Sequence, residues 1–352
     1  MSRMYTPNEI KSRRTVGNII KCCIILMLAA HIVISYQEKQ TLADNGYSRS
    51  VDVGDYSLNM TTMGKCEDGY RIVGISGLKH GDFSVGASKL AESLGKKNQL
   101  IFIDRAGYGL SEDTWKILTV ERAVNDYRRA LNETGIGPPY VLLAEHFGGV
   151  YATYWEATYP SEIEAVVFID GTEMHESEEE SKKGDSRAYW LDAMLSVASR
   201  VGVSRILQTN QYPIYPASFS PTEQAMGKGL TTSTLDSLAP VLEMRHQWDN
   251  IETTYSAVTR NNIPKLYITT DEQWKSKEPV PSERGHDFGD VVRLTVKEPG
   301  DTLTPYLDQM GNCRLTYLGG AGHLYEYRPE DCGKIIQSFL NNLEHYKKMA
   351  VN

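Results

Sequence analysis

The chain has few cysteines and no basic stripe beyond residue 21, and each shortage excludes a class of protein. Its five cysteines form no Cys-x-x-Cys pair and lack the histidine spacing of a zinc site. Acidic residues outnumber basic ones by 45 to 37, which gives a formal net charge of −8. We therefore expect no nucleic-acid partner, because nucleic-acid-binding proteins gather basic side chains on one face.

A local absence is more informative, since no serine or cysteine occurs between Tyr140 and Tyr159. Residues 140–144 are apolar and predict a buried strand, while residues 150–157 predict a helix. The small Ala144 and Gly148 let strand and helix approach closely around one exposed, strained residue, as in a nucleophile elbow. That residue is His146, and histidine tolerates the positive φ that such a turn demands. The sequence predicts an elbow without its usual nucleophile.

Strand patterns alternate with helix patterns along most of the chain, and 41% hydrophobic with 23% charged residues is typical of a globular protein. This alternation predicts a doubly wound, mostly parallel α/β sheet. The core takes residues 50–171 and 263–347. Residues 172–262 lack a strong strand pattern, so we predict that they form a helical cap inserted into the core.

The N-terminal part divides into a polar tail (residues 1–16), an apolar run (17–36) and a polar linker (37–49). A bilayer span needs about 20 mostly apolar residues, which the run supplies. Because basic residues precede it, we expect an uncleaved single-pass signal anchor with a cytoplasmic N-terminus and an extracytoplasmic globular domain. The membrane is thus an expected partner. A cleaved signal peptide and an amphipathic surface segment are the alternatives.

Four stretches then occur in a familiar order: Ser76-Gly-Leu78, Asp104-Arg-Ala-Gly-Tyr-Gly-Leu-Ser111, Ala144-Glu-His-Phe-Gly-Gly149 and Gly320-Ala-Gly-His323. On these motifs the chain, over roughly residues 50–345, resembles the α/β-hydrolase superfamily (fold-1 type), which includes serine esterases and lipases. The resemblance implies an eight-stranded, mostly parallel sheet with a cap. It also implies catalysis by an elbow nucleophile, a histidine base and a carboxylate that orients the base.

The resemblance assigns these roles position by position. The base falls on His323, and the oxyanion-binding backbone amides fall on Leu78 and Phe147. The orienting acid falls on Asp271, with Asp170 as the alternative, and a third possibility is that neither serves. The loop Ser76-Gly77 departs from the His-Gly of many family members without removing the amide of Leu78.

The nucleophile position, His146, leaves three hypotheses open. In the first, the protein is a pseudohydrolase that binds a ligand or partner. In the second, His146 activates water beside the oxyanion amides, with His323 as partner acid, and small ester or acyl substrates are hydrolysed. In the third, His146, His323, Glu145 and an acid hold a metal ion. The spacing is not a metal motif and Glu145 can point away into the sheet, so we predict no metal or other cofactor.

Overall fold

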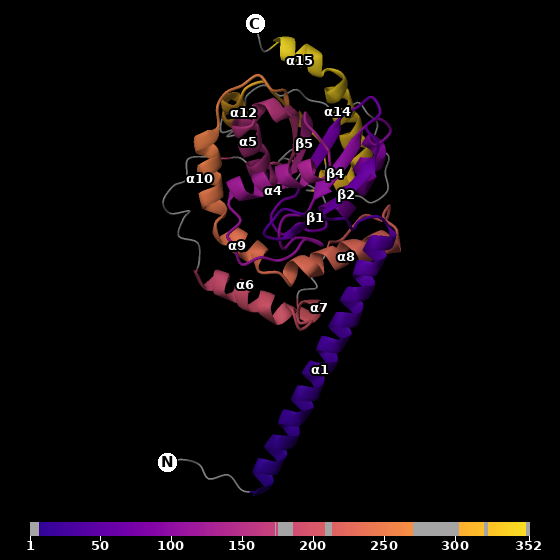
Figure 1. Ribbon diagram of the computed structural model, residues 1–352, viewed down its shortest axis with the longest axis vertical. Helices are drawn as coiled ribbons and strands as arrows, with labels where there is room; N and C mark the ends of the chain where they lie inside the picture. The colour runs from indigo at the N-terminus through magenta and orange to yellow at the C-terminus, as the bar shows by residue number, and fades with distance from the viewer. Residues whose placement is uncertain are drawn as a thin grey trace.

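A central β-sheet organises the computed structural model, which describes residues 7–172, 174, 186–207, 213–269, 303–319 and 323–349 (Figure 1). The sheet has eight strands in the order β1-β2-β4-β3-β5-β6-β7-β8. β1 pairs antiparallel with β2, and β2 with β4, while all other neighbours are parallel. The predicted doubly wound, mostly parallel sheet is therefore confirmed.

The strands lie close to their predicted positions. They are β1 Ser50–Asp52, β2 Ser57–Gly64, β3 Arg71–Ile75, β4 Gln99–Ile103, β5 Tyr140–Glu145, β6 Ile163–Ile169, β7 Lys265–Thr269 and β8 Cys313–Tyr317. Every residue of β5 is buried, and so is all of β6 except Glu164. Such unbroken burial follows from their central place in a parallel sheet that is covered on both faces.

Two hydrophobic cores lie on the two faces of the sheet. One packs the strands against α4 (Val120–Glu133), α5 (Gly148–Thr158), α10 (Gln247–Ala257) and α12 (Leu303–Met310). The other packs them against α2 (Phe83–Gly86), α3 (Ser88–Leu94), α13 (Leu324–Tyr327) and α14 (Pro329–Asn341), with Leu343 of α15 (Leu343–Met349) at its end. The short 3₁₀ helix η1 (Pro160–Glu162) leads into β6.

The insertion between β6 and β7 contains helices and connecting loops, and no strand, in the part of it that the structure describes. It contains α6 (Ser186–Ser199), α7 (Ser204–Leu207), α8 (Pro221–Leu235), α9 (Ala239–Arg245) and α10. The chain breaks near Pro240, because α8 ends at Leu235 and α9 begins with this proline in its first turn. The short helices α7, α12 and α13 were not predicted.

Helix α1 (Pro7–Asp44) extends from the globular part as a single rod (Figure 1). Its stretch Arg14–Asp44 is long and apolar enough to cross a membrane, a property that anchors and signal sequences share. The helix differs from the prediction by continuing to Asp44, inside the expected linker. The reason is tertiary: Leu42 is fully buried in a small core with Tyr215 and Phe219 of the insertion.

Polar contacts also fix α1 to the insertion. Arg205 of α7 forms a bidentate ion pair with Glu38 at 2.7 and 2.8 Å, and it donates to Ser35 Oγ at 3.0 Å. His31 Nε2 lies 3.2 Å from Asp236 Oδ2, just after α8. One face of α1 is thus held by the insertion, while apolar side chains such as Ile25 and Leu26 stay exposed.

Candidate active site

The candidate site lies at the carboxyl edge of the sheet, where the loops after β3, β5 and β6 meet because these strands run parallel. β5 ends at Glu145, and the chain turns through His146 (φ 45°) into α5. At Gly148 a Cβ atom would lie 2.2 Å from the carbonyl oxygen of Ile75, so only glycine permits this close approach of α5 to β3. The predicted elbow, with histidine at its strained position, is confirmed in its backbone.

Glu145 is fully buried, and its carboxylate turns toward the loop after β3. Its Oε2 accepts a hydrogen bond of 2.6 Å from the backbone N–H of Gly77. A Cβ atom on Gly77 would lie 2.8 Å from the same oxygen, so glycine allows the loop to cover the carboxylate. Glu145 therefore does not point away into the sheet.

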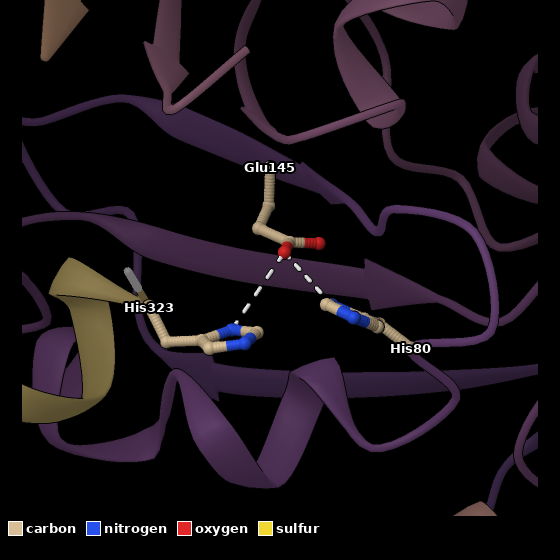
Figure 2. Close-up of side chains that lie close together, drawn as sticks. All are labelled: His80, Glu145 and His323. Atoms are coloured by element: carbon tan, nitrogen blue, oxygen red, sulfur yellow. Dashed lines mark hydrogen bonds and ion pairs between the residues drawn. The ribbon is translucent and has the colours of Figure 1, made fainter. Parts of the chain in front are cut away.

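The other oxygen of Glu145 faces three imidazole rings. Oε1 lies 2.8 Å from His80 Nδ1, 3.3 Å from His146 Nε2 and 4.0 Å from His323 Nδ1. Figure 2 shows His80 and His323 next to each other, each joined to this oxygen by a dashed line. We call Glu145, His80, His146 and His323 the Glu145 cluster.

The charges of the Glu145 cluster are unequal. Burial by itself raises the pKa of Glu145, but the charge and hydrogen bond of His80 outweigh it and hold this pKa at about 2. Burial lowers the pKa of His80, yet the carboxylate of Glu145 raises it to about 9. Burial, and then the charge of His80, lower the pKa of His323. Near neutral pH the cluster thus holds an anion, a cation and a neutral ring in contact.

His323 occupies the predicted position beside the elbow, with φ of 62° immediately before α13. Its ring centroid lies 5.4 Å from that of His146, and its Nδ1 lies 3.3 Å from the hydroxyl of Tyr325. The structure brings the predicted base and the predicted nucleophile position together.

Neither of the two predicted orienting acids is seen in contact with His323 within the residues that the structure describes. Asp271 falls outside the described residues. Asp170 follows β6 with φ of 47°, and its carboxylate accepts a hydrogen bond from Thr269 Oγ1 at 3.0 Å. Its backbone carbonyl lies 3.0 Å from His146 Nδ1. The carboxylate that faces His323 in the described part of the chain is that of Glu145.

The two predicted oxyanion amides belong to the loops on either side of Glu145. Within the described residues, neither the N–H of Leu78 nor that of Phe147 donates to a protein acceptor, whereas the flanking amides of Gly77 and Lys79 bond Glu145 and Tyr108.

A second charged group supports the loop after β3 from behind. Arg105 donates to the carbonyl oxygens of Ser76 at 2.7 Å and Gly77 at 2.8 Å. Its Nε lies 2.8 Å from Oε1 of Glu243 on α9, and this carboxylate also accepts hydrogen bonds from the hydroxyls of Tyr108 and Tyr151. We call Glu243, Arg105, Tyr108 and Tyr151 the Glu243 cluster.

His80 is the site residue that the sequence analysis did not select, and Glu145 had been considered only as a metal ligand. One signal was available for Glu145: a carboxylate at the end of an otherwise apolar buried strand needs a buried partner. No comparable signal marked His80, because its place depends on the path of the loop after β3.

Comparisons with known proteins agree with the fold. A family model described as alpha/beta hydrolase fold matches residues 74–219. The uncharacterized protein YbdG of Bacillus subtilis (strain 168) is 26% identical over 166 residues, which are 45% of this chain and 50% of YbdG. The uncharacterized protein C23C11.06c of Schizosaccharomyces pombe is 34% identical over 67 residues, 19% of this chain and 12% of that protein. The chain thus spans half or less of these curated relatives.

Solved structures resemble the chain over most of its length. The putative ancestral haloalkane dehalogenase AncHLD2 has a TM-score of 0.57 at 16% identity, covering 84% of this chain and 99% of its own. The epoxide hydrolase CorEH has a TM-score of 0.57 at 17% identity, covering 84% and 98%. A Vigna radiata epoxide hydrolase mutant has a TM-score of 0.59 at 14% identity, with the same coverage. At such identities the likeness shows the fold alone.

Proposed function

The chain belongs to the α/β-hydrolase superfamily, and on that premise we propose that it hydrolyses small ester or other acyl substrates with water as the nucleophile. The observation that carries this proposal is the shared oxygen of Glu145, which three imidazoles face at the elbow. An ionised carboxylate costs several kcal/mol to bury. Partly exposed imidazoles around a buried carboxylate can pass protons, which a hydrolytic reaction requires.

His146 acts as the general base in this proposal. Its Nδ1 faces the carbonyl oxygen of Asp170, which can only accept, so Nδ1 carries the hydrogen and Nε2 of the neutral ring carries a lone pair. Nε2 lies 3.3 Å from Glu145 Oε1, so in this proposal the attacking water is bound beside these two atoms. The hydrogen bond to Asp170 thus selects the tautomer that can take a proton.

The reaction balances without a covalent intermediate on the protein. The water oxygen bonds to the carbonyl carbon of the substrate while His146 Nε2 takes the proton of the water. The oxyanion forms beside the amides of Leu78 and Phe147, whose N–H groups support this role. The bond to the leaving oxygen then breaks, and His146 returns the proton to the alcohol.

Turnover of p-nitrophenyl acetate by the purified full-length protein tests the proposal. Because structural neighbours are named as haloalkane dehalogenases and epoxide hydrolases, the substrate panel also contains a haloalkane and an epoxide. We expect His146→Ala to lower kcat about 10²–10⁴-fold, the contribution of a positioned base. His246→Ala is the matched control, since His246 pairs with Asp249 outside the Glu145 cluster.

Equal rates in the wild type, His146→Ala and His246→Ala would show that only background imidazole chemistry is present. The pseudohydrolase hypothesis would then replace this proposal. A fluorophosphonate probe adds a second check, because covalent labelling of any serine in the wild type would contradict a water nucleophile at the elbow.

We further propose that α1 is an uncleaved single-pass anchor with its N-terminus in the cytoplasm. Arg13 and Arg14 before the apolar run support this orientation. An N-terminal tag should resist protease added to intact cells, while the globular part should be cleaved. Retention of the protein in membranes after alkaline extraction, with the tag still attached, distinguishes the anchor from a cleaved signal peptide.

A further inference from the structure

The Glu145 cluster brings one ligand atom from each of two histidines and a glutamate within 4.8 Å of one another. We propose that it binds a divalent transition-metal ion, best matched by zinc, through His80, Glu145 and His323. This proposal differs from the prediction made from the sequence, which was that the protein binds no metal. The catalytic role of the ion rests on the function proposed above, whereas its binding does not.

The distances suit one ion. One ligand atom from each of His80, Glu145 and His323 lies within 4.8 Å of the others. Zinc bonds to nitrogen and oxygen are about 2.0–2.2 Å long, so two ligands of one ion lie at most about 4.3 Å apart. The distances from Glu145 Oε1 to His80 Nδ1 (2.8 Å) and His323 Nδ1 (4.0 Å) already meet this limit. The two imidazole nitrogens lie within 4.8 Å of each other and would meet it after a small shift of one ring.

The rings also surround a common centre. The centroid of His80 lies 5.1 Å from that of His323 and 5.7 Å from that of His146, and the latter two are 5.4 Å apart. The near-equal sides place three imidazoles around Glu145 Oε1. Two histidines and one glutamate with an open fourth position are a ligand set that catalytic zinc sites use.

His146 lies beside the proposed site and is not one of its ligands. Its Nε2 lies 3.3 Å from Glu145 Oε1, and its Nδ1 lies 3.0 Å from the carbonyl oxygen of Asp170. A water molecule in the open position of the ion would therefore lie next to Nε2.

The surroundings hold the carboxylate ready for this task. Gly77 N–H fixes Oε2 at 2.6 Å, which leaves Oε1 for the ion. A hydrogen bond on the remote atom of a ligand orients it and is part of a functioning metal site. The ion would lower the pKa of its bound water to about 7, so His146 would complete the removal of that proton.

Metal content and spectroscopy test the site without relying on turnover. The full-length protein is stripped with a chelator, dialysed and titrated with zinc chloride, and bound zinc is measured by mass spectrometry. We expect one tight zinc per chain. Cobalt(II) in its place should give the visible absorption bands of a four-coordinate site.

His80→Ala and His323→Ala should each weaken zinc binding at least about tenfold, because each removes a ligand. His246→Ala should bind zinc as the wild type does. His80→Asn, which keeps a polar side chain of similar reach, serves where an alanine variant does not fold, as judged by circular dichroism.

A wild-type protein that binds no zinc and gives no cobalt bands would overturn the metal site, and so would equal affinity in the wild type, His80→Ala and His323→Ala. The proposed function fails separately. Turnover that persists in chelator would support water hydrolysis and contradict a catalytic role of the metal ion. Stoichiometric zinc without turnover supports the metal site and removes the hydrolase.

Discussion

Glu243 and Glu145 are both fully buried carboxylates, yet their partners differ in kind. Glu243 is paired with the guanidinium of Arg105 and two phenol hydroxyls, all of them buried. Glu145 faces imidazoles whose side chains are 28%, 36% and 40% exposed, for His80, His146 and His323 respectively. Glu243 is surrounded by buried groups that keep their protons. Glu145 is also buried, but its imidazole partners are partly exposed to solvent and can exchange protons with it.

The two clusters at this edge of the sheet therefore have different roles: one is structural, and the other is the site of the proposed reaction. The Glu243 cluster joins α9 of the insertion to the loop after β3, because Arg105 contacts both. The Glu145 cluster contacts the same loop from the other side through Gly77. The Glu243 cluster therefore positions the loop, and the Glu145 cluster depends on that position for the hydrogen bond from Gly77.

The largest expected effect comes from Glu145→Gln, which keeps the shape of the side chain and removes its charge. We expect kcat for p-nitrophenyl acetate to fall about 10²–10⁴-fold because the imidazoles lose their common anion. Far-ultraviolet circular dichroism should stay as in the wild type. A variant with full activity would place the chemistry elsewhere.

Glu243→Ala should act on stability instead. Removing one partner of a buried ion pair leaves Arg105 uncompensated, at a cost of about 3–5 kcal/mol in the free energy of unfolding. Urea unfolding of the full chain in detergent measures the loss. The double replacement Arg105→Met with Glu243→Met is the control, since removing both charges should recover most of the stability. A loss below about 1 kcal/mol is typical of a surface ion pair. Such a result would show that the Glu243 cluster does not stabilise the attachment of the insertion to the core.

His146→Ser returns a hydroxyl to the elbow and so tests which parts of the machinery remain. We expect water-dependent turnover to fall about 100-fold, since the base is lost. A fluorophosphonate probe should now label Ser at this position, because His323 and the amides of Leu78 and Phe147 still surround it. New esterase activity above the wild-type rate would instead indicate that the native elbow is silent.

Asp104 is a third case, a buried carboxylate held by the neutral donors Asn59 Nδ2 and Leu110 N–H. Burial raises its pKa to about 7, and these hydrogen bonds lower it only in part. The folded state thus holds a proton that the unfolded chain, with an aspartate pKa near about 3.9, has released. Stability should decline as pH rises from about 4 to 7, by at most about 1.4 kcal/mol per unit, and Asp104→Asn should flatten this slope. Unfolding midpoints across that range provide the measurement, and identical slopes would contradict it.

The sequence predicted what depends on local pattern. Buried apolar runs such as residues 140–144 place the strands, and the small Ala144 and Gly148 place the elbow. His323 follows the last strand, β8, and lies at the same edge because parallel strands end together. These features follow from periodicity and sterics along short stretches of chain.

Long-range partners were not predictable in this way. His80 joins the site because its loop folds back over Glu145, 65 residues further along the chain. Residues 37–44 have the composition of a polar linker, yet Glu38 is paired with Arg205, 167 residues away. A side chain whose partner is so distant carries no signal in its own neighbourhood, so its role depends on the finished fold.

The hydrogen bonds from Arg205 to Ser35 and Glu38 restrict how α1 can move relative to the insertion. These two residues lie three positions apart, on one face of α1, so a single guanidinium fixes the rotation of the helix as well as its position. For a helix embedded in a bilayer, tilt responds to the thickness of the hydrocarbon layer. A change of tilt in a membrane-embedded α1 would be transmitted through Arg205 to α7, so the position of the insertion would depend on the thickness of the bilayer.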